Sequence, residues 1–231
     1  FGSRFYPTSI SSAVILFQKG EDCSDAIKSY INYREQNPLI EFYHSILPLI
    51  IQDDTQYVGI SVNYSGQIIP AITLAALIKK AFSRVKIIFG GSLFPAYANK
   101  ISALNIFAEY SDALIIYAGE YPWNNIIEYD TLDYIPGCMR SNGHSFIHNN
   151  LPLPQIKRAL PDFSDYSLQR YLVPHNILQY AMSIGCYWGK CSFCGYQSYK
   201  DICVKRYAQN DIDLGNYVFD DFNIDDSKFF S

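Results

Sequence analysis

Apolar segments alternate with amphipathic ones between residues 57 and 120. The short, β-branched runs have the length and composition of strands, whereas the segment after Gly66 has apolar positions that recur at helical spacing. The predicted strands are 57–62, 85–89 and 113–117, and the predicted helices are 67–82 and a segment that begins near Pro95. Strands separated by helices predict an α/β fold with a parallel sheet, which binds ligands at the carboxyl ends of its strands.

The pattern on either side of this region is less regular. Residues 11–18 and 41–52 are apolar enough to predict helices, and the more polar residues 20–38 predict a connection. Residues 135–174 contain five prolines with several Gly, Asn and Ser, which predicts an irregular linker between domains. We therefore expect a sheet domain over residues 1–134, this linker, and a second domain over residues 175–231, in which 179–184 and 216–219 are strands.

Composition narrows the class of protein. The chain has 231 residues, of which 49% are hydrophobic, enough to bury a substantial core. Its formal net charge of −4 lacks the basic excess of nucleic-acid binders. No apolar run reaches the roughly 18 residues of a membrane span, and the N-terminus has no signal-peptide pattern. We expect a cytoplasmic protein with no membrane span and no nucleic-acid partner.

Three cysteines crowd together directly after the predicted strand 179–184. Cys186, Cys191 and Cys194 have the spacing C-x4-C-x2-C, and thiolates are soft ligands that select iron-sulfur clusters or zinc. Structural zinc sites close with four ligands, and only Cys203 and His175 lie nearby as a fourth. The spacing favours a 4Fe-4S cluster with one open iron over zinc, and both over a purely structural set of thiols.

The segment 183–195, Ser-Ile-Gly-Cys-Tyr-Trp-Gly-Lys-Cys-Ser-Phe-Cys-Gly, resembles the cluster loop of radical S-adenosylmethionine (SAM) enzymes. Phe193 matches the aromatic residue that precedes the last cysteine in that family, although the family's usual first gap is one residue shorter. The resemblance implies that the three cysteines hold a 4Fe-4S cluster whose fourth iron chelates SAM. It also implies that reduction cleaves SAM to a 5′-deoxyadenosyl radical, and that residues 175–231 begin a (β/α) barrel that continues in sequence missing here.

Asp220 and Asp221 follow the predicted strand 216–219. They resemble a segment of the same family that lies near the SAM amino group. A solvated turn is the alternative interpretation, because Asp is common in turns.

Residues 57–120 resemble the later half of the cobalamin-binding domain that precedes the radical domain in one class of these enzymes. Ser61 and the pair Gly90-Gly91 resemble its Ser-x-Leu and Gly-Gly markers, with Asn63 in place of Leu. This resemblance implies a Rossmann-like cobalamin-binding-type domain with Ser61, Gly90 and Gly91 at the cofactor. The Asp-x-His-x-x-Gly element that supplies a cobalt-ligating histidine is absent from this sequence. Cobalamin is therefore a possible cofactor, and we expect structural roles for all four histidines, His44, His144, His148 and His175.

The combined interpretation is a radical SAM enzyme that modifies an unactivated carbon of a peptide or a small molecule, with the help of a reducing electron donor. If cobalamin is bound, the implied outcome is C-methylation, as in a methyltransferase. No catalytic residue beyond the cofactor ligands is identified. Two alternatives remain: a zinc-stabilised binding module, and a cobalamin- or nucleotide-binding sensor whose cluster only reports redox state.

Overall fold

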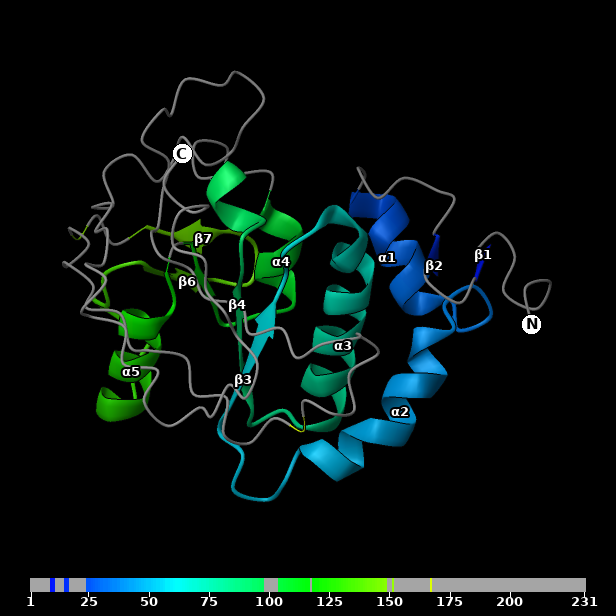
Figure 1. Cartoon of the computed structure of the whole chain (residues 1–231), viewed down its shortest axis with the longest axis horizontal. Helices are drawn as coiled ribbons and strands as arrows, with labels where there is room; N and C mark the ends of the chain where they lie inside the picture. The colour runs from blue at the N-terminus through cyan, green and yellow to red at the C-terminus, as the bar shows by residue number, and fades with distance from the viewer. Residues whose placement is uncertain are drawn as a thin grey trace, which may run out of the picture. The chain divides into compact units, whose positions relative to one another are not determined.

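The computed structural model describes residues 9–10, 15–16, 24–97, 104–116, 118–148, 151 and 167. All of them except Ser167 belong to one compact unit. The described part is a mixed α/β structure built on a five-stranded sheet (Figure 1). Its helices are α1 (Ser24–Asn32), α2 (Leu39–Ile50), α3 (Ile68–Ala81), α4 (Asn105–Glu109) and α5 (Glu120–Tyr129).

The sheet contains parallel and antiparallel strands in the order β3-β4-β5-β6-β7. These strands are β3 (Tyr57–Ser61), β4 (Lys86–Gly90), β5 (Ala113–Ile115), β6 (Cys138–Ser141) and β7 (Phe146–Ile147). The first three run parallel to one another, whereas β6 is antiparallel to β5 and β7 is antiparallel to β6. A separate antiparallel pair is formed by β1 (Ser9–Ile10) and β2 (Ile15–Leu16).

Alternation along the strands divides the core between the two faces of the sheet. Ile87 and Phe89 of β4 belong to the larger core with α3 and α4, whereas Ile88 between them belongs to the smaller core with α5. This is the period-two pattern of a strand that is covered on both faces. Figure 1 shows α3 on one side of the sheet and α5 on the other, with α1 and α2 beyond α3. Both of those outer helices pack against α3.

The predicted βαβαβ order from residue 57 is confirmed, with small differences at the ends of elements. The helix expected from Pro95 is a short 3-10 helix (Phe94–Tyr97), and α4 begins at Asn105. The predicted helix 41–52 is also confirmed, as α2.

Two predictions before residue 39 are wrong. The expected helix 11–18 contains the strand β2, because a short run of β-branched and aromatic residues does not distinguish helix from strand by periodicity. The expected connection 20–38 contains α1, a polar helix whose buried side chains are Ile27 and Tyr30. Ile27, Tyr30 and Ile31 recur at helical spacing in this short segment, a pattern that the polar composition of residues 20–38 obscures.

The sheet extends into the range whose proline and glycine content predicts an irregular linker. β6 and β7 lie at residues 138–147 and form a hairpin that continues the sheet from β5. The three predicted strands are parallel, as expected, but the sheet as a whole is mixed because β6 and β7 add antiparallel pairs. Both strands are short, and the pairing of β6 with β5 joins segments more than 20 residues apart, so no local pattern predicts it.

Several predicted features lie outside the described residues. They are the strands 179–184 and 216–219, Cys186, Cys191, Phe193, Cys194, Asp220 and Asp221. Within the described ranges, no helix has the length and apolar character needed to cross a membrane.

Candidate functional site

The carboxyl ends of β3 and β4 bring together the residues that the sequence singles out in the sheet domain. Ser61, the last residue of β3, is the register partner of Gly90, the last residue of β4. Gly91 follows directly, and the amide of Val62 donates a hydrogen bond to the carbonyl of Gly90 at 2.7 Å. Ser61 is exposed, while both glycines are half-buried. The structure thus places Ser61, Gly90 and Gly91 side by side at one edge of the sheet.

Glycine occurs at positions 90 and 91 for different structural reasons. Gly91 has φ +118°, and a Cβ built there would lie 2.4 Å from the carbonyl oxygen of Val62. Its need for glycine is therefore explained by the backbone alone. A Cβ at Gly90 would lie 3.8 Å from Cβ of Ile115, which is an ordinary van der Waals contact. The described neighbours of Gly90 thus leave room for a small side chain.

Side chains join the loops that follow the two strands. The Oδ1 of Asn63 accepts a hydrogen bond from the backbone N–H of Ser92 at 3.0 Å, and the Ser92 hydroxyl lies 3.3 Å from both Oδ1 and the carbonyl oxygen of Asn63. The N–H of Asn63 in turn donates to Oε1 of Gln67 at 2.7 Å. Sequence reasoning noted Asn63 only as a departure from Leu and missed Ser92 and Gln67, because the pairing of Asn63 with Ser92 spans 29 residues.

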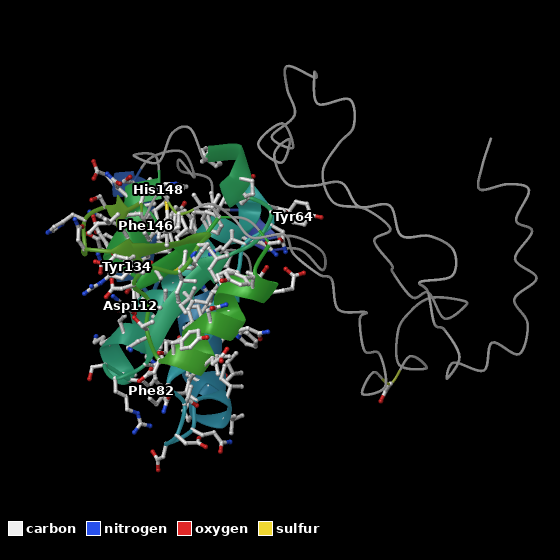
Figure 2. The ribbon with its side chains drawn as sticks, turned by 90° about the vertical axis from the view of Figure 1, so that its left-hand side faces the viewer. Tyr64, Phe82, Asp112, Tyr134, Phe146 and His148 are labelled. Carbon is white, nitrogen blue, oxygen red and sulfur yellow. The ribbon has the colours of Figure 1, made fainter. Side chains whose placement is uncertain are left out.

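Among the residues that the structure describes, nothing covers the surface around these loops. A Cβ at Gly66, before α3, or at Gly119, before α5, would meet no atom within 4 Å. Tyr64 is 74% exposed, and Figure 2 shows its side chain projecting away from the ribbon. Backbone groups and polar side chains are therefore accessible to a ligand at this edge, where ligands bind in open α/β sheets.

The described histidines do not contribute to this edge. His44 lies on α2, His144 lies between β6 and β7, and His148 follows β7. All three are exposed. The loops at residues 61–67, 90–93 and 118–120 contain no histidine, so they offer no imidazole to a metal.

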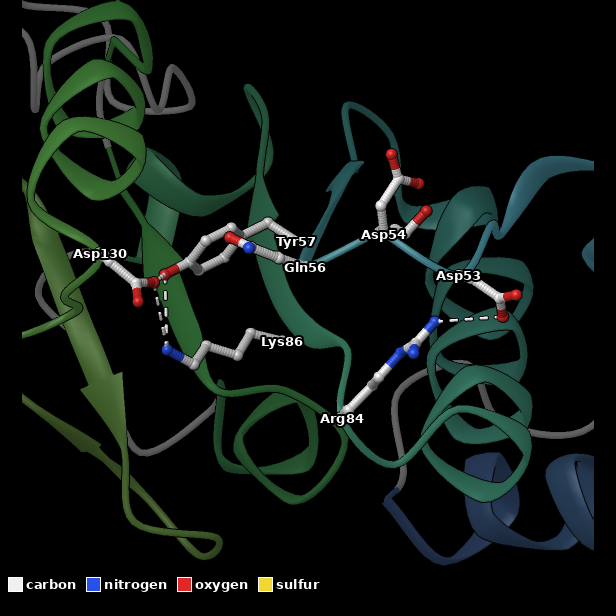
Figure 3. Close-up of a pocket in the computed structure, with 8 residues that line it drawn as sticks. Asp53, Asp54, Gln56, Tyr57, Arg84, Lys86 and Asp130 are labelled. Carbon is white, nitrogen blue, oxygen red and sulfur yellow. Dashed lines mark hydrogen bonds and ion pairs between the residues drawn. The ribbon is translucent and has the colours of Figure 1, made fainter.

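A pocket of about 370 Å³ lies at the opposite, amino end of the strands (Figure 3). In its wall, Lys86 Nζ lies 3.8 Å from Asp130 Oδ1 and 5.2 Å from the centre of the Tyr57 ring. The Tyr57 hydroxyl donates a hydrogen bond to Asp130. Burial is the larger cause, and this hydrogen bond a smaller one, of a raised pKa of Tyr57. Arg84 pairs with Asp53 across 3.7 Å. The wall also contains Asp54, so its three carboxylates outnumber its two cations.

The described cysteine next to the sheet is not a metal ligand candidate. Cys138 of β6 is buried, and burial, followed by the negative charge of Asp133, raises the pKa of its thiol to about 12. The thiol is therefore protonated at neutral pH. In the ranges that the structure describes, no three His, Cys, Asp or Glu side chains are grouped so that they would hold a metal ion.

The described part of the chain thus provides an open edge of small and polar residues, joined by hydrogen bonds between two loops. It supplies backbone and hydroxyl contacts for a ligand, and the loop at residues 118–120 adds the exposed carboxylate of Glu120. No protein-family model, no curated protein and no solved structure matches the chain.

Proposed function

We propose that the protein is a radical SAM enzyme in which Cys186, Cys191 and Cys194 hold a 4Fe-4S cluster. The observation that carries this proposal is the C-x4-C-x2-C spacing after an apolar segment, with Phe193 before the last cysteine. The donor set fits such a cluster, since three thiolates ligate three irons and leave the fourth open. The cluster, when bound, supplies one electron for the cleavage of SAM to methionine and a 5′-deoxyadenosyl radical.

Residues of this chain would then bind and orient SAM and the substrate. Asp220 and Asp221 are proposed to lie near the SAM amino group, because a carboxylate attracts an ammonium group. The substrate is a peptide or a small molecule with an unactivated carbon, from which the radical removes a hydrogen atom. An external reductant must supply the electron.

The sheet domain is proposed to bind a second ligand at the carboxyl ends of β3 and β4. What supports this proposal is that the exposed Ser61 and the half-buried Gly90 and Gly91 lie side by side at this edge, where cobalamin could contact backbone and hydroxyl groups. Bound cobalamin would supply a methyl group for transfer to the substrate. Because the edge offers no histidine, we propose no cobalt ligand from these loops.

The first experiment is anaerobic purification, followed by measurement of iron, sulfide, zinc and visible absorption. We expect brown protein with iron and sulfide, and loss of both in Cys194→Ala. Cys138→Ala is the matched control, since Cys138 is buried in the sheet and its thiol has a pKa of about 12. Iron that survives in Cys194→Ala, or colourless protein with stoichiometric zinc, would rule out the proposed cluster.

A second experiment tests the reaction itself. With dithionite and SAM, the iron-containing protein should release methionine and 5′-deoxyadenosine in equal amounts. Cys194→Ala should release neither, whereas Cys138→Ala should match the unaltered protein. A cluster without SAM cleavage would indicate a redox sensor instead of an enzyme.

A further inference from the structure

We infer that Asn63 and Ser92 are positioning residues, which hold the loops after β3 and β4 in the arrangement that binds a ligand. This inference rests on the proposed cobalamin site at the carboxyl ends of these strands. Each of the two residues holds the other in place, and neither is proposed to contact the ligand directly.

Asn63 connects three parts of the edge. Its side-chain oxygen accepts the N–H of Ser92 at 3.0 Å, and its backbone N–H donates to Gln67 at 2.7 Å. The hydroxyl of Ser92 adds contacts of 3.3 Å to Oδ1 and to the carbonyl oxygen of Asn63. The loop after β3, the loop after β4 and the turn before α3 are therefore joined at one residue.

The bridge matters because the joined side chains are exposed. Asn63, Gln67 and Ser92 are all exposed. Their hydrogen bonds add to the backbone bonds from Val62 to Gly90 and from Leu93 to Val62, which already join the two loops. Ordering the backbone of a loop costs conformational entropy, and a ligand that must order the loop on binding loses affinity for that reason. Hydrogen bonds that order the loops beforehand reduce this cost.

The side chain at position 63 must be an acceptor for the bridge to exist. A Leu there, as in the family that the sequence resembles, offers no oxygen to the N–H of Ser92. The hydrogen bond between Asn63 and Ser92 thus gives a physical role to Asn63, the residue at which this chain departs from the family's Ser-x-Leu pattern.

The test is a double-mutant cycle of Asn63→Leu and Ser92→Ala in the full chain, with hydroxocobalamin as the probe. The dissociation constant is measured from visible absorption at a temperature well below unfolding. We expect Asn63→Leu to raise it about tenfold, which corresponds to about 1.4 kcal/mol. Ser92→Ala should raise it less, because it removes only the hydroxyl contacts and keeps the backbone N–H. The double variant should match Asn63→Leu alone, because that change already removes the oxygen that joins the two loops.

Ser141→Ala is the control for a merely structural effect. Its hydroxyl donates to the carbonyl of Ala108 at 2.6 Å, in another part of the sheet, and its loss should lower the melting temperature without changing the dissociation constant. Additive effects of the two loop substitutions would overturn the inference, since Asn63 would then contact the probe independently of Ser92. An equal loss of affinity in Ser141→Ala, or no loss in Asn63→Leu, would also overturn it.

The cobalamin site and the radical SAM reaction are tested by separate measurements. If the unaltered chain does not bind hydroxocobalamin, the positioning role is overturned together with the cobalamin site. Iron content and SAM cleavage in the same preparation report on the radical reaction, whatever the result of the cobalamin titration. If cobalamin binds as expected in protein that lacks iron, the positioning role stands and the radical proposal fails.

Discussion

Gly91 lies so close to Val62 that a Cβ on Gly91 would be 2.4 Å from the Val62 carbonyl oxygen and 2.6 Å from its nitrogen. The contact fixes the path of the chain at the point where β4 ends. In addition, Gly91 has a positive φ of +118°, a backbone conformation that residues with a side chain rarely adopt.

Gly91→Ala should therefore lower the free energy of unfolding by at least about 2 kcal/mol, through the clash and the unfavourable φ. Urea unfolding measures the effect. Gly66→Ala is the control, because a Cβ at Gly66 meets no atom within 4 Å, and its effect should stay within about 0.5 kcal/mol. Equal effects of the two substitutions would contradict the close approach at Val62.

Gly59 of β3 lies beneath the ring of Trp123, which α5 places over the second face of the sheet. A Cβ at Gly59 would lie 3.0 Å from Cη2 of that ring, so Gly59→Ala should displace the ring at a cost of about 1 kcal/mol. We expect the fluorescence emission of Trp123 to shift to longer wavelength as the ring moves toward solvent. The measurement uses a Trp188→Phe background, which leaves Trp123 as the single tryptophan. An unchanged emission spectrum would argue against this contact.

The buried thiol of Cys138 should make stability depend on alkaline pH. Its pKa is about 12 in the folded protein, against an ordinary value of 9.0, so above pH 9 the unfolded chain releases this proton first. The contribution to stability is complete below pH 9 and is lost as the pH rises toward 12, at up to about 1.4 kcal/mol per pH unit.

Urea unfolding at pH 8 and pH 10.5 checks this dependence. Cys138→Ala removes the thiol, so its stability should fall less between the two pH values than that of the unaltered protein. Parallel losses would show that other groups account for the alkaline dependence.

Asn37 is a fully buried polar side chain that joins the α1–α2 connection to α3. Its Nδ2 donates to Thr73 Oγ1 at 2.9 Å, and its Oδ1 accepts the N–H of Leu39 at 3.1 Å. Asn37→Ala should cost about 2–3 kcal/mol, because it leaves these buried partners unsatisfied.

Asn32→Ala is the matched control for this change. Asn32 is exposed and bonds only locally, to the carbonyl of Lys28, so its loss should cost under about 0.5 kcal/mol. Both values come from urea unfolding at neutral pH. Similar losses at the two positions would mean that burial of Asn37 contributes little.

The part of the fold that the sequence predicted is the part whose signals are local. β3, α3 and β4 follow directly from runs of β-branched residues and from helical spacing of apolar positions. The placement of Ser61 and Gly90 at one edge also followed, because parallel strands separated by a helix have their carboxyl ends on the same side. In contrast, α1 has few apolar residues, and the hairpin of β6 and β7 lies among prolines and glycines.

In the candidate site, too, local features were predicted from the sequence and long-range contacts were not. The identity of Ser61, Gly90 and Gly91 was apparent from their positions after strands, but the reason for Gly91 was not, since it depends on the backbone of Val62. The bridge from Asn63 to Ser92 was missed because Ser has many roles and nothing in a sequence indicates which distant side chain will face it.

The sequence by itself thus determined the α/β class, the order of the central elements and the cysteine spacing on which the proposed reaction rests. Periodicity and spacing are properties of neighbours along the chain, so no tertiary information is needed to see them. The tertiary structure decided that the sheet is mixed, that Gly91 must be glycine, and that Asn63 joins two loops. Each of these depends on residues that are distant in sequence and meet only when the backbone is folded.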